Sequence, residues 1–149
     1  MKVVVQRVLK ASCTVDGKVV SKIGQGFLLL VGFCVNDKAD ILPKIVKKVA
    51  GLRIFEDEEH KLNRSINDIN GEILSISQFT LYASMKKGNR PSFTDAMPGA
   101  EASLLYQAFN KSLAEACHIE VKEGVFGADM KLDFVNDGPC TIILDSLEL

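Results

Sequence analysis

KVVVQRVLKASCTVDGKVVSKIGQGFLLLVGFC, residues 2–34, contains three segments of strand character in immediate succession. Residues 2–9 and 12–23 have the composition and alternation of strands, and residues 26–34 form an apolar run typical of a buried strand. Asp16-Gly17 divides the second segment and can supply the positive φ angles of a two-residue hairpin. The stretch therefore predicts an antiparallel meander at the start of the fold.

Two later segments change to helical spacing. Apolar residues recur three and four positions apart from about Asp40 to Val49, and Gly51 stands where a helix cap belongs. A second helix is predicted from about Ala100 to Ala116, with an apolar face of leucine, alanine and phenylalanine. We therefore expect two main α-helices.

A short strand followed by polar turns is predicted within residues 52–72. Longer strands are predicted at residues 72–83, 129–136 and 140–147, with Asp137-Gly138-Pro139 as a turn between the last two. A long loop, residues 84–99, follows the first of them and is long enough to suggest a functional role. Strands dominate and no repeated β-α-β pattern is present, so the fold class is α+β. We expect a curved, largely antiparallel, barrel-like sheet with the two helices.

The composition is that of an ordinary globular protein, with 47% hydrophobic and 25% charged residues. Its 149 residues allow one hydrophobic core, and no break in composition marks a second, which predicts a single domain over residues 1–149. No apolar run approaches the roughly 20 residues that span a bilayer. The first residues also lack the features of a signal peptide. We therefore expect a cytoplasmic protein that does not contact a membrane.

The cysteines predict free thiols. Cys13, Cys34, Cys117 and Cys140 are far apart, form no C-x-x-C pair and have no histidine at ligand spacing. Neither a disulfide framework nor a metal site is indicated, and no cofactor is expected.

Binding to a polyanion would depend on local charge, because the net charge is −1. Two basic patches are candidates, although each taken alone is more typical of a solvated surface. They comprise Lys86, Lys87 and Arg90 in the long loop, and Lys44, Lys47 and Lys48 on the first predicted helix.

Catalytic motifs are mostly absent. The sequence has no G-x-S-x-G elbow, no H-E-x-x-H and no phosphate-binding glycine loop, and neither His60 nor His118 stands beside an obvious nucleophile. One segment remains, SQFTLYA at residues 77–83, which groups hydroxyls and an amide at a strand end. If the chain turns there, the N–H groups of consecutive residues could stabilise an oxyanion. The alternative is that residues 77–83 form a half-buried strand with the threonine and serine on its solvent-exposed face. The pattern of residues alone favours this alternative.

Five stretches together resemble the D-aminoacyl-tRNA deacylase family, in order and over essentially the whole chain. Two elements, SQFTL and N-x-G-P-x-T, are highly specific in combination, and the variable position of the latter holds Cys140. The stretches are MKVVVQRVLKASCTVDGKVV, RIFEDEEHKLNRSI, SQFTLYA, KGNRPSFTDA and FGADMKLDFVNDGPCTIILDS.

The resemblance implies a homodimeric enzyme that hydrolyses the ester between a D-amino acid and the terminal adenosine of a tRNA. Gly138 and Pro139 would form a cis peptide that enters the pocket of the other subunit and excludes L side chains. A backbone wedge suits this task because it is more rigid than a side chain. Arg7 would brace this segment, although by local pattern alone it reads as a strand arginine that points to solvent.

The same resemblance assigns the backbone of Gln78 and Phe79 to the oxyanion and places Thr80 beside the scissile ester. Ser77 would contribute to substrate binding. Because no base is visible next to Thr80, we favour assistance by the 2′-hydroxyl of the substrate ribose, with the protein supplying orientation and N–H donors.

The aminoacyl-adenosine pocket would also contain Phe126 and Met130, whose alternative is an ordinary place in the core. Lys86, Lys87 and Arg90 would meet tRNA phosphates with little sequence readout.

Two rival interpretations remain. One is a sibling specificity for L-alanyl-tRNA, whose family carries a trans version of the Gly-Pro element, and the other is a catalytically inactive dimeric tRNA-binding module. The preferred amino acids, and any activity on glycyl-tRNA, stay open.

Overall fold

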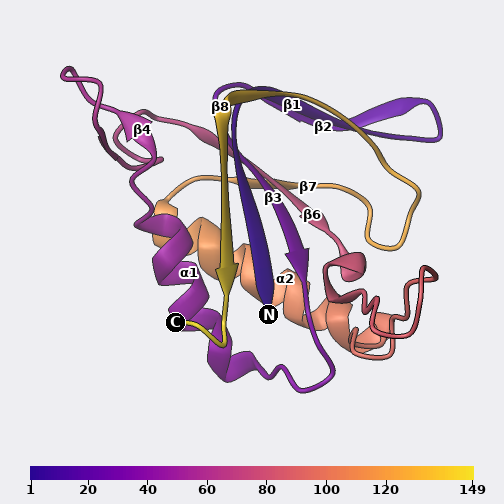
Figure 1. The fold of residues 1–149 in the computed structure, drawn as a ribbon. Helices are drawn as coiled ribbons and strands as arrows, with labels where there is room; N and C mark the ends of the chain where they lie inside the picture. Colours follow the sequence, from indigo (N-terminus) through magenta and orange to yellow (C-terminus); the bar gives the residue numbers. More distant parts are fainter.

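The structure is a computed structural model that describes residues 1–149, and its main feature is one curved sheet of six strands (Figure 1). The strand order is β2-β1-β3-β6-β7, and β8 pairs with β1. The strands of this sheet are β1 (Lys2–Val15), β2 (Lys18–Ile23), β3 (Gly26–Gly32), β6 (Glu72–Ser77), β7 (Val121–Glu123) and β8 (Lys131–Asp145). A separate small hairpin consists of β4 (Phe55–Glu56) and β5 (Leu62–Arg64).

The predicted antiparallel meander is confirmed, with Asp16 and Gly17 at φ 49° and 75° in its first hairpin. β1 is one continuous strand that pairs with β3 along its first half, with β2 along its second half and with β8 along most of its length. β3–β6 and β6–β7 are parallel pairs, which the sequence did not reveal. The expected α+β class and the curved, mostly antiparallel, barrel-like sheet are confirmed.

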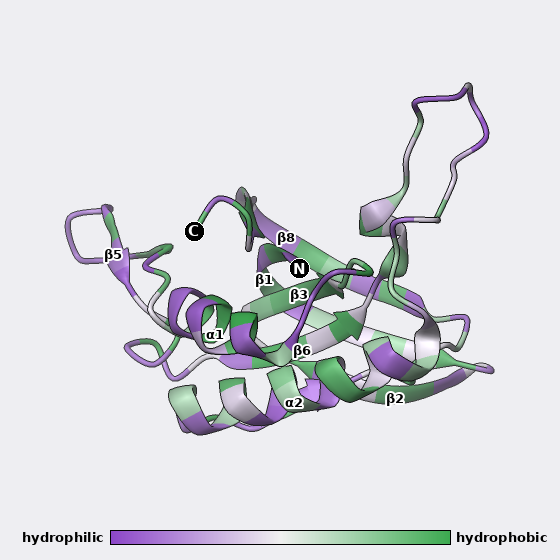
Figure 2. Cartoon of the chain, turned by 90° about the horizontal axis from the view of Figure 1, so that it is seen from below, coloured by the Kyte–Doolittle hydropathy of each residue, from purple (hydrophilic) through white to green (hydrophobic).

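The two predicted helices are also confirmed. α1 (Leu42–Ala50) follows a short 3₁₀ turn, η1 (Ala39–Ile41), and carries Pro43 in its first turn, where the missing N–H has no intrahelical partner to lose. α2 (Gly99–Cys117) ends at His118, which adopts the left-handed conformation with φ 54°. Figures 1 and 2 show both helices on the same side of the sheet.

The centre of the sheet, β3 and β6, is buried on both faces. Between the sheet and the helices lies the larger core, to which β3 contributes Phe27, Leu29 and Val31. The concave side encloses a second core of seven residues, among them Leu28 from β3. Two-sided burial explains why β3 is almost entirely apolar instead of alternating.

An ionic contact ties the two sides of the curved sheet together. Lys122 on β7 donates to the carboxylate of Glu72 at 2.7 Å and to the carbonyl of Lys22 on β2 at 2.9 Å. The pKa of Glu72 is lowered, first by its hydrogen bond with Lys122 and then by the Gly24 N–H. The gap between β2 and β7 is therefore bridged by a side chain where no backbone pairing closes it.

The predicted turn between two final strands is wrong, because β8 runs through residues 137–139 as one strand. Asn136 pairs with Val8 and Thr141 with Gln6, so the four residues 137–140 lie opposite Arg7 alone. This bulge accommodates Pro139, which has no N–H to give to the ladder. The Gly138-Pro139 peptide is cis, and Gly138 has φ 127°.

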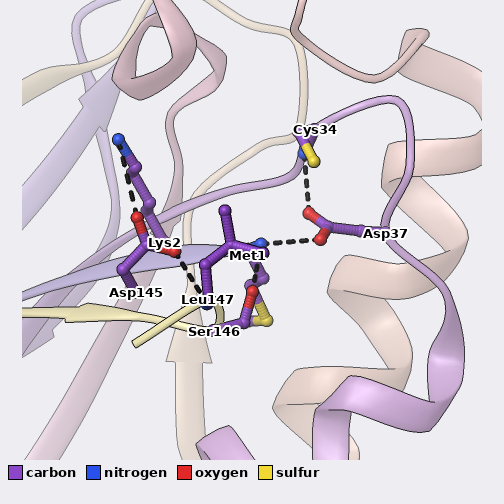
Figure 3. Close-up of polar contacts among 7 residues, drawn as sticks. All are labelled: Met1, Lys2, Cys34, Asp37, Asp145, Ser146 and Leu147. Carbon is purple, nitrogen blue, oxygen red and sulfur yellow. Dashed lines mark hydrogen bonds and ion pairs between the residues drawn. The ribbon is translucent and has the colours of Figure 1, made fainter. Parts of the chain in front are cut away.

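The start of β1 is fastened by polar contacts (Figure 3). The Met1 ammonium donates to Asp37 Oδ1 at 2.7 Å and to Ser146 Oγ at 2.8 Å. Asp37 Oδ2 accepts the N–H of Cys34 at 2.7 Å. These bonds hold β1, the end of β8 and the loop after β3 together.

Neither helix combines the length and apolar character required to cross a membrane.

Candidate active site

The SQFTL segment lies where β6 ends and the chain turns. β6 stops at Ser77, Gln78 has φ −145° and ψ 85°, and a 3₁₀ turn, η2 (Phe79–Tyr82), begins at the next residue. The predicted strand over residues 72–83 is therefore six residues shorter at its end than expected.

Glycine at position 32 makes this turn possible. A Cβ on Gly32 would stand 2.7 Å from the Gln78 carbonyl oxygen, closer than real Cβ atoms approach, and 3.2 Å from Leu81 Cβ, a tight contact. η2 thus passes directly over the end of β3. Gly32 could not be singled out from the sequence, since only the parallel pairing of β3 and β6 brings it beside Gln78.

The turn decides which N–H groups are available. The Gln78 N–H donates to the Val31 carbonyl at 2.7 Å and so extends the sheet ladder, which corrects the expectation that it could face an oxyanion. Phe79 and Thr80 begin η2, and N–H groups in the first turn of a helix have no partner within it. The backbone donors that η2 leaves unpaired within itself are those of Phe79 and Thr80.

A pocket of about 590 Å³ opens beside this turn. It brings Ser77, Gln78 and Phe79 together with Phe126 and Met130, five of the predicted site residues. Most of its wall is apolar, as in sites that enclose an organic ligand. The other lining residues are Val31, Gly32, Phe33, Ile76, Phe93, Ala96, Met97, Gly99, Ala102, Gly127, Ala128, Asp129 and Leu132.

Thr80 is exposed and does not line the pocket. Its hydroxyl accepts a hydrogen bond from Gln78 Nε2 at 2.6 Å. No histidine, carboxylate or lysine is hydrogen-bonded to it, so the chain supplies no base that would make the hydroxyl a nucleophile.

A buried tyrosine supports the far wall of the pocket. The Tyr106 ring lies against Phe126 with centroids 5.8 Å apart, and its hydroxyl donates to the Ser75 carbonyl at 2.8 Å. Burial raises the pKa of Tyr106, so the group stays a neutral donor. The position of Tyr106 in the predicted helix did not indicate that it would support the pocket wall.

A second glycine packs this wall. A Cβ on Gly124 would lie 2.5 Å from Met130 Sδ and 2.9 Å from Ile76 Cδ1. Gly124 therefore lets the Met130 side chain sit close to the end of β7. This position was also missed, because it depends on a contact six residues along the chain.

Arg7 is only 7% exposed, so the local interpretation of a solvent-facing arginine is wrong. Its Nη1 donates to the Ile54 carbonyl at 2.6 Å, and its Nε donates to the Asp137 carbonyl at 3.1 Å and lies 3.3 Å from the Asp137 carboxylate. The guanidinium therefore connects the bulge in β8 to the segment before β4.

Gly138 and Pro139 are exposed, and neither lines the pocket of its own chain. A Cβ on Gly138 would meet the Cys140 nitrogen at 2.9 Å and Arg7 Nη2 at 3.1 Å. The bulge is therefore packed closely against Arg7 on its inner side, while its outer side is exposed to solvent. Within one chain, the two specific sequence elements do not form one site.

The basic residues of the long loop lie near the turn. Ser84 and Ser92 exchange backbone hydrogen bonds of 2.8 and 2.9 Å, and the chain between them carries Lys86, Lys87 and Arg90, all exposed. The lysines of α1 lie on the opposite side of the molecule from this loop (Figures 1 and 2). The two basic patches therefore do not form one surface.

No group of three or more histidine, cysteine, aspartate or glutamate side chains is placed to hold a metal ion.

Comparison with known proteins gives consistent results. Residues 4–145 match the family model described as D-Tyr-tRNA(Tyr) deacylase. A solved structure named c-Myc DNA Unwinding Element Binding Protein is 43% identical and superposes with a TM-score of 0.90, covering 97% of this chain and 98% of that one. A structure described as a probable eukaryotic D-amino acid tRNA deacylase is 19% identical with a TM-score of 0.82, covering 96% and 97%, and shows the shared fold.

Proposed function

The chain belongs to the D-Tyr-tRNA(Tyr) deacylase family, and from that premise we propose that it hydrolyses the ester between a D-amino acid and the terminal adenosine of a tRNA. The pocket beside η2 is the observation that carries the proposal. The pocket joins the turn at Phe79 to an apolar wall that includes Phe126 and Met130. An adenosine would therefore find an apolar surface, and its ester would find the Phe79 N–H as a donor.

In this proposal the chemistry rests on position and backbone donors. Water attacks the ester carbonyl, and the charge that develops on its oxygen is stabilised by the N–H group of Phe79, a residue of the pocket wall whose N–H has no partner within η2. The substrate 2′-hydroxyl assists the attack. The bond to the ribose oxygen breaks, and that oxygen takes the proton that the attacking water gives up, as the free amino acid and tRNA leave.

Chiral selection is assigned to Gly138 and Pro139 of a second copy of the chain. The pair is exposed and lies outside its own pocket, while Arg7 holds the bulge through Asp137. The carbonyl groups of Gly138 and Pro139 would hold the amino group of a D-residue and leave no space for an L side chain. β1 and β8 also expose apolar side chains that a homodimer would cover, among them Leu9 and Ile143 at 50% and 66% exposure.

Deacylation of D-tyrosyl-tRNA and L-tyrosyl-tRNA, each with a chelator present, tests the proposal. We expect rapid loss of the D-ester alone. If only L-alanyl-tRNA is cleaved, the sibling specificity replaces the D-specific one. If the protein binds tRNA but cleaves no ester, it is an inactive binding module and the proposal fails.

Thr80→Ala is expected to keep kcat within about tenfold of the unaltered enzyme, because the hydroxyl has no base beside it and lies outside the pocket wall. Single-turnover deacylation of D-tyrosyl-tRNA measures this directly. A loss of several orders of magnitude in kcat would show that the hydroxyl is the nucleophile.

A further inference from the structure

Two phenylalanines that line the pocket are also open to solvent. Phe79 is 56% exposed and Phe93 is 37% exposed, although the protein has two well-filled cores. Their rings meet edge to face, with centroids 5.0 Å apart and planes inclined at 68°. An exposed aromatic pair is more informative than a single exposed apolar residue, because it provides a contiguous apolar surface for a partner.

The chain segment that contains both rings is positively charged, although Asp129 also lines the pocket that they share. From Gln78 to Thr94 the chain contains no acidic residue, while it contains Lys86, Lys87 and Arg90. None of these three cations takes part in an ion pair within the chain. Aromatic rings and unpaired cations on one short segment are the two components of a surface for single-stranded nucleic acid.

The size of the pocket decides which nucleotide would reach the pair. A volume of about 590 Å³ falls within the range that encloses one small organic ligand. On the proposed function, that ligand is the terminal adenosine with its amino acid. The nucleotide before it must then lie outside the pocket, at the rim that Phe79 and Phe93 form.

We propose that Phe79 and Phe93 form a stacking platform for the base of the unpaired nucleotide that precedes the terminal adenosine. Its phosphate points toward the loop with Lys86, Lys87 and Arg90. This inference rests on the proposed function for the occupant of the pocket. The platform tolerates any base, because every base has a face that can stack and neither ring offers a polar group for readout.

Phe93→Ala tests the platform with two substrates, D-tyrosyl-tRNA and a D-tyrosyl ester of adenosine alone. We expect the loss in kcat/KM on the tRNA to exceed the loss on the short ester by about tenfold, which is the size of effect expected when one stacking partner is removed. Phe93→Tyr keeps a ring and should recover most of the difference. Leu104→Ala, at an apolar position of α2 that is 69% exposed and outside the pocket, controls for the loss of surface area.

Equal losses on both substrates would overturn the platform and leave the deacylase function standing. The trinucleotide CCA and adenosine monophosphate, measured by calorimetric titration, separate the two ideas further. We expect CCA to bind at least about tenfold more tightly than the mononucleotide, with Phe93→Ala removing most of that advantage and Phe93→Tyr retaining it. If this pattern holds in a protein that cleaves no ester, the platform stands and the proposed function falls. If CCA has no advantage, the platform is wrong.

Discussion

Phe79→Pro is expected to lower kcat about 100- to 1,000-fold below that of Phe79→Ala, which is the usual effect of removing one oxyanion donor. Both substitutions delete the aromatic ring, but only proline also deletes the N–H. The pair of variants therefore isolates the backbone donor from the side chain, including any contribution of the ring to nucleotide binding.

The local backbone allows this comparison. Phe79 is the first residue of η2, a position that accepts proline, and Gln78 before it has φ −145° and ψ 85°, outside the helical region that a following proline disfavours. The Gln78 N–H bond to Val31 is preserved in both variants. Single-turnover deacylation of D-tyrosyl-tRNA gives kcat, and urea unfolding should give free energies of unfolding within about 1 kcal/mol of each other. Equal kcat values for the two variants would exclude the Phe79 N–H as an oxyanion donor.

Arg7→Met is expected to lower the free energy of unfolding by about 2 to 4 kcal/mol, because it leaves the buried Ile54 carbonyl and the partly buried Asp137 without their partner. Arg7→Lys should recover only part of this, since one ammonium cannot reach both sides as a planar guanidinium does. Lys10→Met, at an exposed position on the same strand, should change stability by less than about 0.5 kcal/mol.

The same arginine provides a test of chiral selection. If Arg7 fixes the bulge that carries Gly138 and Pro139, the more conservative variant, Arg7→Lys, should cleave L-tyrosyl-tRNA faster relative to D-tyrosyl-tRNA than the unaltered enzyme does. Asp137→Asn, which keeps the carbonyl contact and removes the charge, should show a smaller change in this ratio. An unchanged ratio in Arg7→Lys would mean that the arginine stabilises the fold without positioning the selective segment.

Sequence reasoning recovered the elements whose signal is local. The first hairpin, the two helices and the α+β class depend on alternation, spacing and turn residues that lie within a few positions of each other. The boundary of β8 was misjudged for a physical reason. Proline interrupts a strand only where its missing N–H is needed, and here a bulge of four residues opposite Arg7 removes that need.

Some residues of the candidate site could likewise be predicted from local sequence, and others could not. SQFTL and the Gly-Pro pair can be recognised in the sequence as motifs. The residues that pack around the site can be recognised only from their contacts in the folded structure. Gly32 matters through the Gln78 carbonyl, and Tyr106 through the Phe126 ring. Neither contact produces a periodic pattern in the sequence. The contact of Gly32 with Gln78 arises from the parallel pairing of β3 with β6, which cannot be predicted from either strand alone.

The hydrogen bond from Gln78 to Val31 has a consequence for the motions of the site. Val31 lies on the strand that is buried from both sides, which is the part of a fold whose amides exchange with solvent most slowly. The entry to η2 therefore shares the rigidity of the sheet centre, while the loop between Ser84 and Ser92, with its exposed backbone, can open on its own. The turn that faces the reacting ester would be anchored through Gln78 to the centre of the sheet, and the tRNA would first be met by an exposed loop.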